Sequence, residues 1–399
     1  MTNLKPRTGG ALLGLAAIVL LAASLVAVVV YRSATGPGSG ANDVRLGWQA
    51  AVSSPGTAAL ARPVTLGSGL VVLTPDGAAQ VIGDVSASTW SSSDGSSWSR
   101  LSQPGAIAEP GRSIMIVATC ADRHGGLVAG GTSAIASDPT LALKATIWHS
   151  SDGRTWDPAT VDGDVGASVE DVAAGPDAIV AVGLAQPGNA GTSRGLAWYS
   201  SDGMTWHPAS VSDSDGFSLL AVTAWRGRFV ATGSGTGGRA AAWTSSDGAR
   251  WTQVASLPEG FEAHRLVAFG DRIVAVGSVA GRSEPESFTS DDARSWTQAI
   301  MPLDATAAQA TVWVSDAVEL NGRLVAVGYS AIGVVPEATS VPPPGPLVWI
   351  SGDGLSWRLL PPDMTLSGSL SGAAVLGSHV VLTTRDSGGS PIYVGAPAG

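Results

Sequence analysis

The segment WSSSDGSSW at residues 90–98 and the segment WHSSDGRTW at residues 148–156 follow one pattern: an aromatic residue, then Ser at the third position, Asp at the fifth and Trp at the ninth. The pattern occurs six times, and its final tryptophans are 58, 50, 45, 45 and 61 residues apart. Repetition at such a period indicates an array of similar structural units. The six aspartates are Asp94, Asp152, Asp202, Asp247, Asp292 and Asp353.

Each copy predicts a β-hairpin. Gly directly follows Asp in five copies, and Gly permits the positive φ of a tight turn, whereas Asp and Ser side chains accept hydrogen bonds from turn amides. A second hairpin with short apolar strands precedes the copies, as in DAIVAVG at 177–183 and GRLVAVG at 322–328. Each unit is therefore expected to hold four short strands, and four-stranded sheets repeated radially form a β-propeller.

A seventh unit is expected to be split between the two ends of the chain. Strands are expected near residues 373–376, 380–384 and 391–394, and no fourth strand follows them. The segment VRLGWQAAV at 44–52 resembles the fourth strands of the other units, with Trp48 at their Trp position. We therefore predict an all-β fold, a seven-bladed β-propeller over residues 43–399 closed by the N-terminal strand, since closure removes exposed sheet edges.

The N-terminal region predicts a membrane anchor. Residues 11–30 are twenty apolar positions without a charge, enough to cross the hydrocarbon core as a helix. Lys5 and Arg7 precede them, which favours a cytoplasmic N-terminus. We expect residues 1–10 in the cytoplasm, a transmembrane signal-anchor helix at 11–31 and a Gly/Ser/Pro linker at 32–42. A cleaved signal peptide is the alternative, although its apolar region is usually shorter. The prediction is a single-pass cell-membrane protein with an extracytoplasmic propeller.

The composition limits the classes of molecule that the protein is expected to bind. The chain has 22 basic and 32 acidic residues, whereas nucleic-acid binders show a basic surplus, so no nucleic-acid partner is expected. Cys120 is the single cysteine, which excludes an internal disulfide and a cysteine-based metal cluster. The histidines show no ligand spacing, and the glycine-rich segment 233–238 precedes an expected strand rather than a helix, so neither a metal nor a cofactor is expected. Two lysines beside twenty arginines are typical of a GC-rich bacterial genome.

At these repeats the chain resembles the Asp-box (BNR) repeat proteins of the sialidase-like β-propeller superfamily. The family pattern is Ser-x-Asp-x-Gly-x-Thr-Trp; here Gly follows Asp directly, and Ala293 replaces Gly in the fifth copy. The resemblance implies that the six aspartates are structural and lie on the face away from the active site. Sialidases also carry an Arg-Ile-Pro motif, which Ala61-Arg62-Pro63 does not match, so the resemblance is not taken to imply hydrolysis.

The longer loops predict which face of the propeller binds a ligand. They fall on the rim opposite the Asp-box turns, and loops on a rigid scaffold commonly carry function. Turn chemistry is the simpler explanation of the acidic residues there. The candidate ligand-binding residues are Asp162, Asp164, Asp213, Asp215, Glu259, Glu262 and Trp313. A register set by the Asn321-Gly322 turn pairs Val314 with Tyr329, which places Trp313 and Tyr329 on opposite faces of the sheet.

The sequence is consistent with three functions. The first is a non-catalytic binding or scaffold module for a protein or glycan. The second is a sialidase-like glycoside hydrolase with a divergent active site, which needs two carboxyls about 5–10 Å apart. The third is a cation-dependent adhesion module. Converging Asp, Glu and Arg side chains in the central depression favour the hydrolase, and an apolar or merely acidic rim favours the binder.

Overall fold

The computed structural model describes residues 45–55, 61–76, 86–135, 143–185, 193–304, 307, 310–331, 345–385 and 390–398. The predicted cytoplasmic segment, membrane helix and linker lie outside these residues. Within the described part of the chain, no helix has the length and apolar character needed to cross a membrane.

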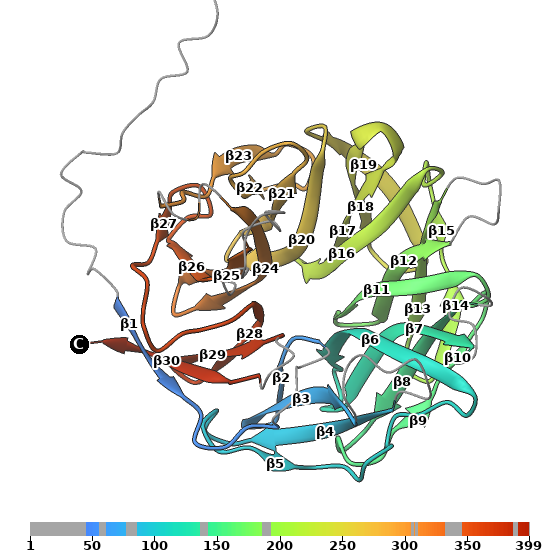
Figure 1. Ribbon diagram of the computed structural model, residues 1–399. Coiled ribbons are helices and arrows are strands. Elements are labelled where there is room, and N and C mark those ends of the chain that lie inside the picture. The colour runs from blue at the N-terminus through green and yellow to red at the C-terminus, as the bar shows by residue number, and fades with distance from the viewer. Residues whose placement is uncertain are drawn as a thin grey trace, which may run out of the picture. The chain divides into compact units, whose positions relative to one another are not determined.

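Seven sheets surround a central axis, and the innermost strand A of each is followed outward by strands B, C and D (Figure 1). Blade 1 holds β2 (Val64–Leu66), β3 (Gly69–Pro75), β4 (Ala87–Ser92) and β5 (Ser99–Arg100). Blade 2 holds β6 (Arg112–Ala121), β7 (Leu127–Ile135), β8 (Lys144–Ser150) and β9 (Asp157–Pro158). Blade 3 holds β11 (Ala167–Ala174), β12 (Ile179–Ala185), β13 (Arg194–Ser200) and β14 (Thr205–Pro208). The predicted propeller is confirmed.

The other four blades repeat this arrangement. Blade 4 holds β16 (Phe217–Trp225), β17 (Arg228–Gly235), β18 (Ala240–Ser245) and β19 (Arg250–Leu257), with the short helix η1 (Thr236–Gly238) between β17 and β18. Blade 5 holds β20 (Phe261–Phe269), β21 (Arg272–Val279), β22 (Glu286–Ser290) and β23 (Thr297–Ile300). Blade 6 holds β24 (Thr311–Leu320), β25 (Arg323–Ala331), β26 (Gly345–Ser351) and β27 (Trp357–Leu359). Blade 7 holds β28 (Leu370–Leu376), β29 (His379–Thr384), β30 (Tyr393–Ala398) and β1 (Arg45–Ala50).

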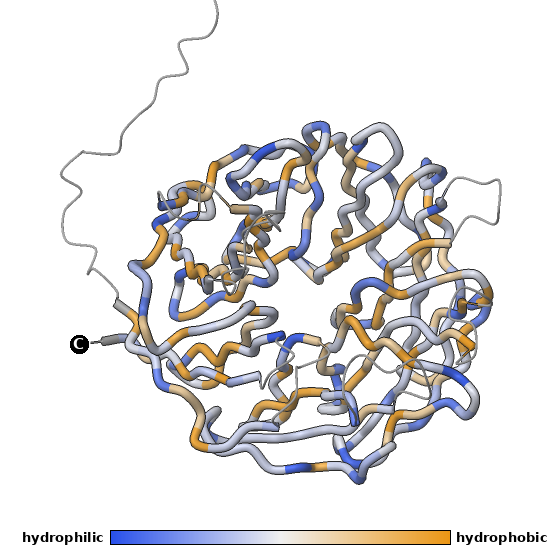
Figure 2. Tube along the Cα trace, in the orientation of Figure 1, coloured by the Kyte–Doolittle hydropathy of each residue, from blue (hydrophilic) through white to orange (hydrophobic). Residues whose placement is uncertain are grey.

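Two short strands link neighbouring blades. β10 (Thr160–Val161) pairs in parallel with β14, and β15 (Ser210–Val211) pairs in parallel with β19. Apolar residues recur in every blade, and buried clusters fill the spaces between neighbouring sheets (Figure 2). Because each sheet is covered on both faces, its inner strands are mostly apolar and do not alternate between apolar and polar residues.

The N-terminal strand closes the ring. β1 pairs antiparallel with β30, and Trp48 lies opposite Gly395. Trp48 is 7% exposed, and a Cβ on Gly395 would lie 2.4 Å from its ring, so only Gly leaves room for the indole. The predicted closure is confirmed, and the position of an Asp-box turn in blade 7 is taken by the two ends of the propeller.

The Asp-box turns are held by one repeated set of hydrogen bonds. In blade 3, Ser200 Oγ accepts a bond from the Gly203 amide and donates one to Asp202 Oδ1, each at 2.9 Å. The same carboxylate oxygen accepts the amides of Met204 at 2.8 Å and Thr205 at 2.9 Å. Gly203 has φ of 76°, and in blade 5 Ala293 occupies the equivalent position at φ of 64°. The six aspartates are thus turn-forming residues.

These turns predict acid sensitivity. Hydrogen bonds from the Thr205 and Met204 amides hold the pKa of Asp202 below its ordinary value. A depressed folded-state pKa gives stability that is complete above the unfolded value of about 3.9 and is lost as the pH falls through the folded value. Asp202→Asn is therefore expected to lower the melting temperature at pH 7, and the difference from the parent chain should shrink below about pH 4. Thermal unfolding from pH 3 to pH 7 measures this, and a difference independent of pH would contradict it.

Every inner strand from blade 2 to blade 7 contains a β-bulge at the same level. In blade 3 the register shifts between Val169 and Asp171, which leaves Glu170 without a cross-strand partner. The bulged residues are Val117, Glu170, Leu220, His264, Ser315 and Ser371.

In blades 2 to 6 a glycine on strand B faces the bulge, whereas β29 of blade 7 has threonines there. A Cβ on Gly183 would lie 1.9 Å from the Ser168 carbonyl oxygen, and one on Gly328 would lie 1.9 Å from that of Trp313. The final Gly of each VAVG-type segment thus permits the inner strand to bulge. Bulges are known to redirect side chains beside functional sites.

The bulge in blade 6 overturns one prediction. Because Ser315 is extra, Trp313 pairs with Tyr329 and Val314 pairs with Gly328. The two aromatic rings lie on the same face and stack, with centroids 5.3 Å apart and planes inclined by 20°. The expectation that they point to opposite faces was wrong, since it assumed an uninterrupted register from the Asn321-Gly322 turn.

Candidate functional site

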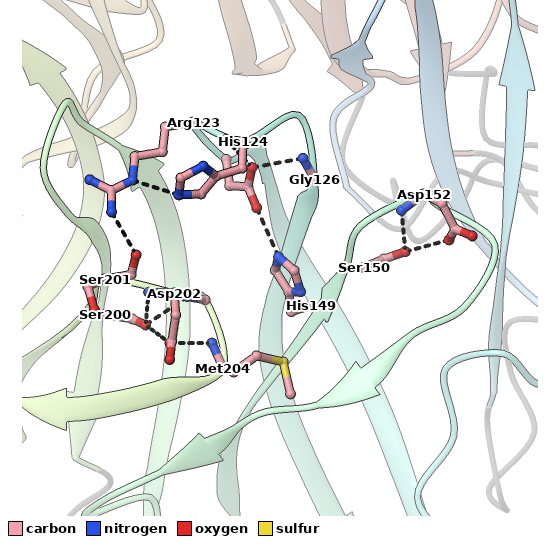
Figure 3. Close-up of polar contacts among 12 residues, drawn as sticks. Arg123, His124, Gly126, His149, Ser150, Asp152, Ser200, Ser201, Asp202 and Met204 are labelled. Carbon is pink, nitrogen blue, oxygen red and sulfur yellow. Dashed lines mark hydrogen bonds and ion pairs between the residues drawn. The ribbon is translucent and has the colours of Figure 1, made fainter.

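Chain direction defines two rims. The A–B turns and the Asp-box turns lie at one end of the inner strands, here the turn rim, and the B–C and D–A connections lie at the other, here the loop rim. Arg123 shows the arrangement of the turn rim. Its guanidinium donates to the carbonyl of Pro176 in an A–B turn at 3.1 Å. It also donates to that of Ser201 in an Asp-box turn at 3.1 Å (Figure 3). Beside it, His149 Nε2 lies 2.9 Å from Asp122 Oδ2.

Four charged residues cross the middle of the central channel; we call them the quartet. Arg62 Nη2 lies 2.9 Å from Asp171 Oδ1, and Arg265 Nε lies 3.2 Å from Asp316 Oδ1. A longer approach of 3.8 Å joins Arg265 Nη1 to Asp171 Oδ2. Both carboxylates are almost fully buried, so their charges are balanced within the channel rather than by solvent.

The quartet fastens neighbouring inner strands to each other. Asp171 Oδ2 accepts the amide of Val222 in the next blade at 2.9 Å, and its Oδ1 accepts the amide of Val172 at 2.9 Å. Asp316 repeats the arrangement with the amides of Ala317 at 2.8 Å and Ala373 at 2.9 Å. These amides lie on the free inner edges of strands and would otherwise lack a partner. Asp171 and Asp316 are thus engaged in holding the ring.

The two arginines differ in how their charges are balanced. Burial opposes the charge of Arg62, but the carboxylates of Asp171 and Asp316 outweigh burial and raise its pKa. Burial, followed by the nearby charge of Arg62, lowers the pKa of Arg265. Arg265 is therefore the less well compensated cation.

Above the quartet, towards the loop rim, lies a cavity of ≈ 140 Å³ that we call the loop-rim recess. It is lined by all six bulged residues together with Ala61, Arg62, Asp171, Asp316 and Arg385. The bulges thus direct one side chain from each of six blades to the mouth of the channel. The recess is polar and carries both signs of charge.

Glu170 is the acidic residue of the recess that lies outside the quartet. Burial raises the pKa of Glu170, and the carboxylates of Asp171 and Glu262 add to that effect, while a 2.8 Å hydrogen bond from Ser168 Oγ opposes it. His264, the bulged residue of blade 5, lies 2.6 Å from the Val314 carbonyl through Nδ1 and 3.8 Å from Glu262 through Nε2. A raised pKa favours the protonated carboxyl, which can donate as well as accept hydrogen bonds.

The predicted ligand-binding residues lie on the loop rim but divide among several places. Asp213 and Glu259 line one groove of ≈ 450 Å³ in blade 4. Phe217 and Arg239 also line it, and the Arg239 guanidinium lies 4.4 Å from the Phe217 ring and donates to the carbonyl of Asp215 at 3.2 Å.

The other predicted residues stand apart from this groove. Asp164 pairs with Lys144 at 3.3 Å, and Asp162 lies 3.5 Å from His207. Glu262 is half-exposed beside His264, and Trp313 is 37% exposed in its stack with Tyr329. Within the described ranges no group of His, Cys, Asp and Glu has a geometry that could hold a metal ion.

Sequence reasoning missed the residues of the channel. A signal for them exists, because polar pairs interrupt otherwise apolar inner strands: Glu170-Asp171, His264-Arg265 and Ser315-Asp316. Each pair falls at the same distance from the A–B turn that ends its strand. Alignment of the strands on these turns brings the three pairs to one level.

No family model matches the chain, and no curated protein matches it. Among solved structures, a phage phi92 endosialidase matches with a TM-score of 0.51 and 9% identity, covering 88% of this chain and 69% of that one. The propeller fold is therefore sialidase-like. The Hadza microbial sialidase Hz136 matches with a TM-score of 0.46 and 16% identity, covering 80% of this chain and 74% of that one. A Trypanosoma rangeli sialidase matches with a TM-score of 0.47 and 11% identity, covering 85% of this chain and 54% of that one.

Proposed function

We propose that the propeller is a binding module that holds a polar group of a protein or glycan at the loop-rim recess, without catalysis. The observation that carries this proposal is the state of the two deep carboxylates. Asp171 and Asp316 each accept two backbone amides and face an arginine, so neither is free to transfer a proton or attack a substrate. Glu170 and Arg385 at the mouth of the recess remain to contact a ligand.

Binding is tested with the tagged full-length chain on a glycan array and in a pull-down from the producing cell. Glu170→Gln and Arg385→Gln are each expected to lower the affinity for the glycan or protein so identified by about tenfold or more. This is the usual effect of losing a hydrogen bond to a charged group. Arg154→Gln, an exposed residue of the turn rim, is the matched control. The proposal fails if Arg154→Gln abolishes binding and both recess variants retain it.

The expected membrane anchor gives this module an orientation. β1 begins at the turn rim, so a linker at 32–42 would join the propeller there, and we propose that the loop rim faces away from the bilayer. Cysteines at the exposed positions Asp213 and Ser246, in a Cys120→Ala background, test this in intact cells. Both should react with an impermeant maleimide, and a lipid-borne quencher should affect position 246 more than position 213. The reverse order contradicts the orientation.

A specific observation favours glycoside hydrolysis as the second candidate. Acidic and basic side chains do converge in the channel, and the carboxylate of Glu262 contributes to the raised pKa of Glu170. A raised carboxyl pKa suits a general acid, with Glu262 as its partner carboxylate. Fluorogenic aryl glycosides, an aryl sialoside among them, test this candidate. Turnover that Glu170→Gln abolishes and Asp177→Asn leaves intact replaces the binding proposal with the hydrolase, and no turnover above background supports the binding module.

A further inference from the structure

Below the quartet, towards the turn rim, the channel widens into a second cavity of ≈ 460 Å³ that we call the turn-rim funnel. Its walls are the last residues of the inner strands, mostly alanine and valine; Ala174, Ala224, Ala268, Val318 and Val375 are examples. Volumes of this order are typical of small-ligand sites, which are largely apolar with a few polar groups that fix orientation. The funnel lies on the face opposite the loop-rim recess.

The floor of the funnel is cationic. Arg62 and Arg265 line it, whereas Asp171 and Asp316 line the recess on the other side of the quartet. The single acidic residue among the lining residues is Glu319 at the mouth, and its carboxylate accepts the Gly322 amide at 2.7 Å. Of the quartet, Arg265 lines the funnel alone, Arg62 lines both cavities, and the two carboxylates line the recess alone.

One nitrogen of the Arg265 guanidinium, Nε, lacks a hydrogen-bond acceptor. Its Nε is buried and has no hydrogen-bond partner among the described residues, although Asp316 Oδ1 lies 3.2 Å away out of line with the N–H. The other approach, to Asp171, is 3.8 Å. A buried donor without an acceptor loses its solvation without compensation. Arg265 also lines the funnel, so an anion bound there would add a charge partner for its guanidinium.

We propose that the turn-rim funnel is a binding site for a small monocarboxylate with a short aliphatic body, whose carboxylate meets Arg265 and whose hydrocarbon lies against the alanine and valine walls. A carboxylate matches the planar fork of a guanidinium. The nearby charge of Glu319 disfavours a ligand with a second negative charge. The site is separate from the loop-rim recess, so it stands or falls independently of the proposed function.

Calorimetric titration of the full-length chain with hexanoate tests the site. Hexanoate is expected to bind, whereas hexanol has the same body without the charge, acetate has the charge without the body, and each should bind at least tenfold more weakly. Arg265→Gln should weaken hexanoate binding by about tenfold or more, the effect of losing a hydrogen bond to a charged group. The site is overturned if hexanoate does not bind, or if hexanol binds as tightly.

A second variant avoids the quartet, because Arg265→Gln can also loosen the fold. Ala268 is exposed at the wall of the funnel, so Ala268→Phe fills the funnel without touching a charged residue. Ala108→Phe, at an exposed alanine outside the funnel, is the matched control. Hexanoate binding should be lost in Ala268→Phe and retained in Ala108→Phe, and both variants should keep the melting temperature of the parent chain. Retention of binding in a folded Ala268→Phe chain overturns the proposal.

Discussion

Asp171→Ala is expected to lower the free energy of unfolding by about 3–5 kcal/mol, the usual effect of removing one partner of a buried ion pair. The variant leaves Arg62 buried without its 2.9 Å partner and deprives the Val222 amide of its acceptor. The first loss acts between β11 and Arg62, just before β2 of blade 1, and the second acts where blades 3 and 4 meet. Chemical denaturation followed by tryptophan fluorescence measures the change.

Asp177→Ala is the matched control for this variant. Asp177 lies in the exposed A–B turn of the same blade, and its removal is expected to change the free energy by no more than about 0.5 kcal/mol. Equal effects of the two substitutions would mean that the quartet does not fasten the ring.

Gly183→Ala is expected to destabilise the chain by about 3 kcal/mol, at the upper end of the range for overpacking. The added Cβ would lie 1.9 Å from the Ser168 carbonyl oxygen, a backbone atom that cannot rotate away. The strand must move or the bulge at Glu170 must close, so the variant should also disturb the loop-rim recess. Thermal unfolding and binding at the recess, measured together, check both effects.

Gly352→Ala serves as the control for the glycine substitution. A Cβ at Gly352 would meet nothing within 4 Å, so this change should leave stability within about 0.5 kcal/mol of the parent chain. If Gly183→Ala is equally silent, the glycine is not what permits the bulge.

The repeat was sufficient to predict the blades, because its signals are local. Ser200, Asp202 and Gly203 form their turn almost entirely with each other, so the pattern of residues determines the geometry. Closure was predictable for a related reason, since Trp48 occupies the same place in its strand as the repeat tryptophans. The parallel strands β10 and β15 were not predicted, since two-residue pairings between blades leave no recognisable pattern.

The channel was not predicted, because its residues are brought together by register. One extra residue at Ser315 was enough to move Trp313 from one partner to another. The same kind of shift turns Glu170 and His264 towards the axis. The acidic loop residues were conspicuous in the sequence. Asp213 and Glu259, from two successive D–A connections, share a groove, whereas Asp162, Asp164 and Glu262 lie beside other partners.

The ring is closed only if β1 completes blade 7. Gln49 and Val394 lie directly opposite each other in the β1–β30 ladder, at a separation that a disulfide can bridge. The cysteine pair Gln49→Cys and Val394→Cys, in a Cys120→Ala background, should therefore form an intramolecular disulfide on mild oxidation, detected by peptide mass mapping. Gln49→Cys with Ala396→Cys, displaced by two residues, should link far less. A stronger link in the displaced pair, a link only between molecules, or no link in either pair would contradict the closed propeller.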